Sequence, residues 1–270
     1  MPLSKVDFAN ILFAGPCNRC CPDCIGHHLP ARVNHSNLEQ FPPRNITGLI
    51  DAVNALHIHR IIFTATNTDP QLYCCEVALL DTLRERIHTG AEYALHTNGA
   101  LALQKIEAFR HYDKATISIP SFNPHTYARM MGSSDVPDIA CIIEQADIPI
   151  NLSMLLSAHN VGEIPQYLKH CAAIGVRRVV LRKRYAEMRE WNILQGEQPK
   201  YFYRQNPVYD IDGVEVTYWT FETTTSTSLN LFADGTLSET YLMAEMQEIR
   251  ATVSDHTSTT KNSPPESGSF

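Results

Sequence analysis

Long apolar runs are missing from this 270-residue sequence. None approaches the roughly 20 consecutive residues that a helix needs to cross a bilayer, and Met1–Val6 lacks the cationic segment and long apolar core of a signal peptide. Hydrophobic residues still make up 44% of the chain, enough for a sizeable buried core. We therefore expect a globular cytoplasmic protein that makes no contact with a membrane.

The sequence also lacks a surplus of positive charge. It contains 22 Lys and Arg against 29 Asp and Glu, and its formal net charge is −7. Proteins that bind nucleic acids without regard to sequence neutralise phosphates with extra Lys and Arg. The acidic balance therefore argues against general nucleic-acid binding.

Short apolar segments alternate with longer amphipathic ones up to about residue 200. The short segments predict strands, and the longer ones, whose apolar residues recur at helical spacing, predict helices. The expected strands are 8–15, 60–64, 92–97, 115–120, 149–155 and 178–182. The expected helices are 46–56, 70–88, 101–112, 138–145, 161–173 and 185–194.

Repeats of strand and helix build a parallel sheet with right-handed crossovers. These six are fewer than a closed barrel needs. We therefore predict an α/β fold whose core, residues 6–200, is a partial (β/α)6 TIM-like barrel with its ligand site at the carboxyl ends of the strands.

The pattern changes after this core. Residues 214–220, 228–232 and 237–242 alternate like strands, with a turn signal at 233–236. We expect residues 201–250 to form a β-rich C-terminal extension that closes over the open side of the sheet. The Ser-, Thr- and Pro-rich segment 251–270 is predicted to be a disordered tail.

Four of the 8 cysteines fall in one short segment directly after the first expected strand, and such a concentration indicates metal binding. Cys17, Cys21 and Cys24 have the spacing C-x3-C-x2-C, which resembles the signature of the radical S-adenosylmethionine superfamily. That resemblance implies a 4Fe-4S cluster held by three thiolates, with S-adenosylmethionine on the iron that has no protein ligand. It further implies reductive cleavage of S-adenosylmethionine to a 5′-deoxyadenosyl radical, which abstracts hydrogen from a substrate.

Four further segments are similar to this superfamily. Residues 95–101 resemble its third strand, whereas 117–132, 173–182 and 229–237 are similar to the branch that contains the molybdenum-cofactor cyclase. The auxiliary-cluster cysteines of that cyclase have no counterpart after residue 200. We therefore expect a substrate different from that of the cyclase.

Two positions depart from the superfamily pattern. Asp23 precedes the last cysteine of the motif, where members usually carry an aromatic residue. The loop Ala65–Pro70 lacks the two glycines of the usual Gly-Gly-Glu-Pro motif, whose backbone holds the methionyl ammonium group. We expect Asp69, or the backbone of Asn67 and Thr68, to hold that group here.

Further candidate contacts lie within or at the end of three expected strands. By the resemblance, Ser118 contacts the ribose of S-adenosylmethionine, and either Thr97 or Asn98 faces cofactor or substrate. Arg182 could pair with the carboxylate of S-adenosylmethionine or with an anionic substrate, because guanidinium groups bind carboxylates in a bidentate way. Each residue also has a simpler interpretation. Ser118 could be a small polar residue inside the barrel, Asn98 could form a turn with Gly99, and Arg182 could belong to a solvated basic surface.

A structural zinc site is the alternative interpretation of the cysteines. Cys17 with Cys20, and Cys21 with Cys24, could supply four thiolates to one ion. Zinc sites usually separate two such pairs by about a dozen residues, however, and here the pairs adjoin. The chain would then be a non-catalytic zinc- or iron–sulfur-binding module. A third possibility is a superfamily member that keeps the cluster but does not cleave S-adenosylmethionine.

The sequence predicts classes of partner. We expect a small-molecule substrate, and the basic residues around Arg182 favour an anionic one, such as a nucleotide or sugar phosphate. We expect it to enter from the open side, beneath Tyr218, Trp219 and the residues around Tyr201–Tyr209. The resemblance implies an external one-electron reductant of flavodoxin or ferredoxin type.

The remaining cysteines and the histidines have no assigned role. The histidines, His96 among them, are scattered along the chain. The other cysteines fall among apolar residues of expected helices, where a buried free thiol is the usual outcome. These are Cys74, Cys75, Cys141 and Cys171.

Overall fold

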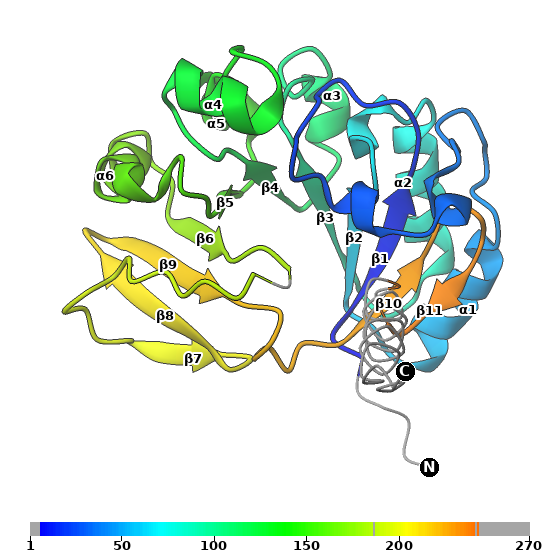
Figure 1. Cartoon of the computed structure of the whole chain (residues 1–270). Helices are drawn as coiled ribbons and strands as arrows, with labels where there is room; N and C mark the ends of the chain where they lie inside the picture. Colours follow the sequence, from blue (N-terminus) through cyan, green and yellow to red (C-terminus); the bar gives the residue numbers. More distant parts are fainter. Residues whose placement is uncertain (1–5, 186, 241, 243–270) are drawn as a thin grey trace, which may run out of the picture.

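The chain forms one curved sheet with helices along its outer side (Figure 1). The computed structural model describes residues 6–185, 187–240 and 242. Its 11 strands lie in the order β11-β10-β1-β2-β3-β4-β5-β6-β9-β8-β7. Strands β1 to β6 are parallel neighbours in sequence order, which confirms the predicted partial barrel. They are Phe8–Phe13, Arg60–Ala65, Glu92–Thr97, Lys114–Ser118, Ile150–Leu155 and Arg178–Arg182.

Helices occupy most of the segments predicted to be helical. They are α1 (Ile46–Ala55), α2 (Glu76–Arg86), α3 (Ile106–Phe109), α4 (Pro124–Met131), α5 (Ile139–Ala146) and α6 (Ile164–Ala173). Short 3-10 helices cover Ile25–His28, Ala31–Asn34, Pro70–Leu72 and Val161–Glu163. Among the described residues, no helix combines the length and the apolar character that crossing a membrane requires.

Helix α4 is absent from the sequence-based prediction, and one predicted helix is wrong. α4 begins after Asn123, whose side chain accepts a hydrogen bond from the backbone of His125, with a proline in the first turn. The described residues of 185–194 form no helix. Met188 is 90% exposed there and its next two neighbours are also exposed, whereas Trp191 is buried in the main core, so the segment is anchored at its C-terminal part only.

The C-terminal extension widens the sheet at both edges. Strand β9 (Val214–Trp219) lies parallel to β6. Next to β9 in the sheet are β8 (Asn206–Ile211) and then β7 (Tyr201–Tyr203), each antiparallel to its neighbour. Strand β10 (Ser228–Leu231) lies parallel to β1 and pairs with β11 (Leu237–Ser238). The extension therefore adds strands to both ends of the core sheet instead of forming a separate layer.

Figure 1 shows the link between β9 and β10 running along the bottom of the molecule from one edge of the sheet to the other. The predicted boundary near residue 200 stays a prediction. The predicted tail, 251–270, and the last residues of the extension, 243–250, lie outside the described residues.

The register of the strands separates an apolar face from a polar one. Residues such as Phe63, Leu95 and Ile117 lie on the outer face, are fully buried and belong to the main hydrophobic core. Side chains alternate between faces along a strand, so their neighbours face inward. The inward residues are mostly polar and include Thr64, His96, Thr116, Ser118, Ser153 and Arg182.

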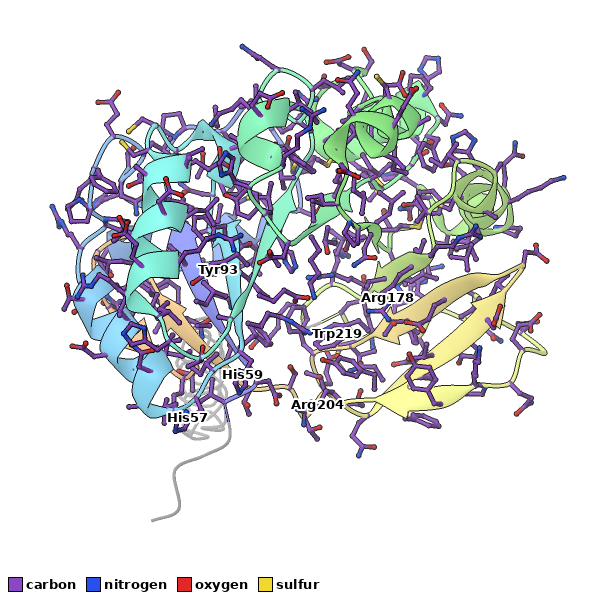
Figure 2. All side chains as sticks on the ribbon, turned by 180° about the vertical axis from the view of Figure 1, so that it is seen from behind. His57, His59, Tyr93, Arg178, Arg204 and Trp219 are labelled. Atoms are coloured by element: carbon purple, nitrogen blue, oxygen red, sulfur yellow. The ribbon has the colours of Figure 1, made fainter. Side chains whose placement is uncertain are left out.

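Polar contacts connect the C-terminal extension to the start of the core. At the β1–β10 edge, buried Asn10 donates a hydrogen bond from Nδ2 to Oδ1 of Asn230 at 2.7 Å. At the bottom, Asp7 forms an ion pair with Arg204, which precedes β8. Figure 2 labels Arg204 in this region. The backbone of Thr227 also donates to Oδ2 of Asp7 at 3.0 Å, so Asp7 contacts both sides of the opening.

Glu92, the first residue of β3, links three neighbouring strands. Its carboxylate lies 3.0 Å from Nε of Arg60 on β2 and pairs with Lys114 on β4. Burial opposes ionisation of Glu92, but the hydrogen bond and charge of Lys114, together with Arg60, lower its pKa below the usual value of 4.5.

We expect Glu92→Gln to lower the free energy of unfolding at about pH 7 by about 0.5–1 kcal/mol, a small effect because solvent screens a carboxylate that is 39% exposed. The native pKa lies below the unfolded value, so this contribution is complete above the unfolded pKa and is lost as pH falls through the native pKa. Urea unfolding measured from neutral to acidic pH should therefore show that the difference in unfolding free energy between the variant and the unmodified protein becomes smaller as pH falls. Glu144→Gln, at an exposed position, is the control; a difference that does not change with pH would contradict the assignment.

Candidate functional site

A cavity of about 1110 Å³ lies at the carboxyl ends of the core strands. Its wall combines the cysteine-rich loop after β1 with the loop after β2 and with the inward residues of β3 to β6. This is the end of the sheet at which the sequence predicted a ligand site. Cys17, Cys21, Cys24 and all four other predicted contact residues line it, namely Asp69, Asn98, Ser118 and Arg182.

The three motif cysteines are half-buried in the cavity wall. The backbone N–H of Cys24 donates to the carbonyl of Cys21 at 3.2 Å, which turns the loop between these two residues. Sγ of Cys24 lies 3.9 Å from the carbonyl oxygen of Thr66, and Sγ of Cys21 lies 3.6 Å from Sδ of Met131. The loop therefore holds its thiols between the β2 loop and α4.

The thiols are close enough to influence one another. Burial raises the pKa of Cys21 to about 12, and the charges of Cys24 and Cys17 add to the effect. Burial also raises the pKa of Cys17, with further contributions from the charges of Asp69 and Cys24. Three thiolates here would repel one another, so the arrangement favours a cation that shares them.

Two glycines let neighbouring segments pack tightly on the cysteine loop. A Cβ on Gly26 would lie 2.5 Å from Cβ of Asn67, and a Cβ on Gly132 would lie 2.7 Å from the carbonyl oxygen of Cys20. Gly132 also has a φ of +69°, a conformation that glycine adopts without strain. The backbone of Cys20 donates to the carbonyl of Met131 at 3.1 Å. The loop is thus clamped from both sides.

The donor set suits a cluster better than a single ion. Among the residues that the structure describes, no group of three or more His, Cys, Asp or Glu side chains is placed to hold one metal ion. Cys17, Cys21 and Cys24 would hold a four-iron cluster with one thiolate each. Cys20 is exposed, unlike the other three. The residues present therefore fit a cluster with three protein ligands.

Asp69 orders the loop after β2 from within. It is 2% exposed, and its carboxylate accepts hydrogen bonds from the Thr97 hydroxyl at 2.8 and 2.9 Å and from the backbone of Asn98 at 2.7 Å and Gln71 at 3.0 Å. Burial raises the pKa of Asp69, and these donors oppose that rise. The side chain therefore fixes the ends of β2 and β3 relative to each other.

Asn98 connects β3 to the cysteine loop. Its Nδ2 donates to Oδ1 of Asn18 at 2.7 Å, and its Oδ1 accepts from the backbone of Ala100 at 2.9 Å. The side chain thus stabilises the turn that the Asn98-Gly99 pair suggested and also reaches the cavity wall. Ser118, at the end of β4, is exposed towards the cavity.

His96 is a cavity residue that the sequence reasoning missed. It faces inward from β3, in register with Thr116 of β4. Burial lowers the pKa of His96 to about 3, and the positive charge of Arg182 adds to this, so the imidazole is neutral at physiological pH. The sequence did contain a signal for His96. Side chains alternate between the two faces of β3, so His96 lies on the face opposite buried Leu95.

Two residues that line the cavity form an ion pair that no local pattern reveals. Nη1 of Arg184, just after β6, donates to Oδ1 of Asp23 in the cysteine loop at 2.7 Å. Asp23, which stands where an aromatic residue is usual, thus ties that loop to the opposite side of the cavity. Beside it, the rings of Tyr185 and Phe221 meet edge to face with their centroids 5.6 Å apart, and both line the cavity.

The aromatic residues expected at the entrance do not line this cavity, and the entry route stays a prediction. Tyr218 and Trp219 are not among the lining residues, whereas Tyr185 and Phe221 are. Trp219 pairs with Arg182 across β9 and β6, so it shares the inner face of the sheet. Figure 2 shows it between the two halves of the molecule.

Sequence comparisons return no relative, whereas structure comparisons do. No family model and no curated protein matches the sequence. SuiB from Streptococcus suis, bound to its precursor peptide SuiA, has a TM-score of 0.54 at 11% identity, covering 95% of this chain and 47% of SuiB. SuiB bound to S-adenosylmethionine has a TM-score of 0.52 at 12% identity over 69% of this chain and 41% of SuiB. The enzyme anSMEcpe with bound AdoMet and the Cp18Cys peptide has a TM-score of 0.50 at 13% identity, covering 69% of this chain and 55% of anSMEcpe.

The chain has the radical S-adenosylmethionine fold. The expectation that the sequence motif raised about the architecture is therefore confirmed. The chain spans about half the length of these structures. The narrower resemblance to the molybdenum-cofactor cyclase branch stays a prediction.

Gly26→Ala tests whether the cysteine loop is clamped. The added methyl group would lie 2.5 Å from Cβ of Asn67 and 2.9 Å from the carbonyl oxygen of Thr66, so the two loops must separate. We expect urea unfolding to show a loss of about 1–3 kcal/mol, as for other overpacked sites. Gly162→Ala is the matched control, because nothing lies within 4 Å of its added Cβ. Equal stabilities for the two variants would contradict the clamp.

Proposed function

We propose that this chain is a radical S-adenosylmethionine enzyme in which Cys17, Cys21 and Cys24 hold a 4Fe-4S cluster. The observation that supports this most directly is the position of the three thiols: half-buried, side by side in one loop, and lining a large cavity at the carboxyl ends of the strands. When bound, the cluster with S-adenosylmethionine would supply the one-electron chemistry that makes hydrogen abstraction from an unactivated carbon possible. The fold and the motif support the same assignment independently.

The residues around the thiols have distinct proposed roles. Asp69 acts as a positioning residue, because its carboxylate is committed to Thr97, Asn98 and Gln71 within the protein. The backbone of the loop that it orders would then hold the methionyl ammonium group. Ser118, with a free approach from the cavity, would contact the ribose.

Arg182 supplies positive charge to the inner face of the sheet. Its side chain lines the cavity, and its charge depresses the pKa of His96. A guanidinium group here suits the carboxylate of S-adenosylmethionine or an anionic group on a substrate. Neutral His96 beside it can donate and accept hydrogen bonds without adding a second positive charge.

The substrate that we propose is a small anionic molecule, such as a nucleotide or sugar phosphate. A peptide is the second candidate, because the structures of SuiB and anSMEcpe that resemble this chain contain peptides. A peptide in the cavity would lie close to the Asp23–Arg184 ion pair, whose two residues line it. A substrate screen should therefore include both classes.

The electron for this chemistry would come from an external reductant of flavodoxin or ferredoxin type. A non-catalytic zinc module is the alternative function, and it needs four thiolates on one ion. The exposure of Cys20, in contrast to the half-buried Cys17, Cys21 and Cys24, weighs against it.

Anaerobic reconstitution with iron and sulfide tests the proposal. We expect the reduced protein to give a four-iron electron paramagnetic resonance signal that changes when S-adenosylmethionine is added. Serine substitutions at Cys17, Cys21 and Cys24 should abolish the signal, whereas Cys20→Ser, in the same loop but exposed, should retain it. Retention of zinc without iron, or equal loss in the Cys20 variant, would contradict the three-thiolate cluster.

Arg182→Gln tests the anion-binding role. A charged hydrogen bond contributes about 1.5–3 kcal/mol, so we expect S-adenosylmethionine to bind roughly 10- to 100-fold more weakly. The control is Arg178→Gln, at the other end of β6, where Arg178 lies 2.6 Å from Oε1 of Glu215; Figure 2 labels this residue. Isothermal titration of the reconstituted protein measures both affinities. If Arg182→Gln binds S-adenosylmethionine as tightly as the unmodified protein does, Arg182 does not contact it.

A further inference from the structure

Two adjacent cysteines lie on the outer surface, away from the cysteine loop. Cys74 and Cys75 connect the 3-10 helix Pro70–Leu72 to α2, and their Sγ atoms are 2.9 Å apart. The sequence predicted buried thiols, but Cys74 is exposed and Cys75 is half-buried. The two side chains therefore point to the same side of the chain and are accessible to solvent.

The surroundings of this pair provide access for a reagent. The two cysteines line a surface hollow of about 290 Å³, together with Glu76, Lys105 and Ala108. Cys141, by comparison, has a half-buried thiol that accepts a hydrogen bond from Nε2 of Gln145 at 3.1 Å. The pair thus differs from an ordinary surface thiol in having a second thiol within contact distance.

The backbone on both sides of the pair is anchored. The N–H of Cys74 donates to the carbonyl of Leu38 at 3.0 Å. Nζ of Lys105 donates to the carbonyl of Gln71 at 2.5 Å and to Oε2 of Glu76 at 2.8 Å. These contacts restrict the segment and keep the two thiols together, which lowers the entropic cost of joining them. The hydrogen bond with Cys75 raises the pKa of Cys74 above its usual value, so it confirms that the two sulfur atoms are in contact.

We propose that Cys74 and Cys75 form a modification site, a vicinal dithiol that glutathione disulfide oxidises reversibly to a vicinal disulfide. One thiolate attacks the glutathione disulfide, whose S–S bond breaks to release one glutathione and leave a mixed disulfide. The second thiol then displaces the other glutathione and forms the Cys74–Cys75 bond. Two protein thiols lose two electrons and two protons in total, and the glutathione disulfide gains them as two glutathione molecules.

The chemistry of neighbouring residues makes this disulfide easy to reduce. Consecutive Cα atoms are about 3.8 Å apart, closer than the roughly 4.4–6.8 Å usual for disulfides. The ring is therefore strained, and strained disulfides belong to the labile and regulatory class. The site does not depend on the cluster or on S-adenosylmethionine, so it can be tested separately from the proposed function.

The sequence allows a direct test on the whole protein. Trypsin cleaves after Arg60 and Arg84, and the peptide 61–84 contains Cys74 and Cys75 as its only cysteines. Reconstituted protein is equilibrated anaerobically in glutathione buffers of increasing disulfide content, quenched with acid, alkylated, digested and analysed by mass spectrometry. We expect peptide 61–84 to become two hydrogens lighter and to lose both alkylation sites together. Excess reduced glutathione should restore them.

Serine variants separate a linked pair from two independent thiols. In Cys74→Ser and Cys75→Ser the remaining thiol should stay alkylated or carry glutathione, with no internal crosslink. Cys141→Ser should leave the transition of peptide 61–84 unchanged. Full alkylation of both thiols throughout the buffer series, or glutathione on each cysteine without a crosslink, would overturn the proposal.

Discussion

The alternation of side chains along parallel strands is the constraint on which the rest of this structure depends. It sends apolar residues such as Phe63 and Leu95 outward, where helices bury them, and polar ones such as His96 and Thr116 inward. A shift of one residue in register would exchange the two faces. The polar inner face can therefore surround a charged ligand while the outer face supplies the hydrophobic core that stabilises the fold.

The site combines this fixed sheet with a cysteine loop that has little regular structure of its own. Close packing at Gly26 and Gly132 positions the loop from two sides, and the Asp23–Arg184 ion pair connects it to the far wall of the cavity. The loop can therefore present three thiols without a surrounding helix or strand. Such positioning matters because cofactor chemistry leaves orientation and shielding to the protein.

The segment after β2 serves both the cavity and the outer surface. Asp69 fixes its first part to β3 through buried hydrogen bonds, and Lys105 anchors the part that leads to Cys74 and Cys75. These hydrogen bonds hold one short segment, residues 69–75. The candidate ligand site lies at the start of this segment, and the pair of surface thiols lies at its end.

The sequence by itself determined the strand–helix alternation, the partial barrel and the position of Cys17, Cys21 and Cys24, because each depends on spacing within a short segment. Tertiary structure decided the rest. Asp23 and Arg184 are 161 residues apart, and β10 joins β1 through the distant pair Asn10–Asn230. Contacts of this kind depend on how the whole chain closes, and neither periodicity nor local spacing carries that information.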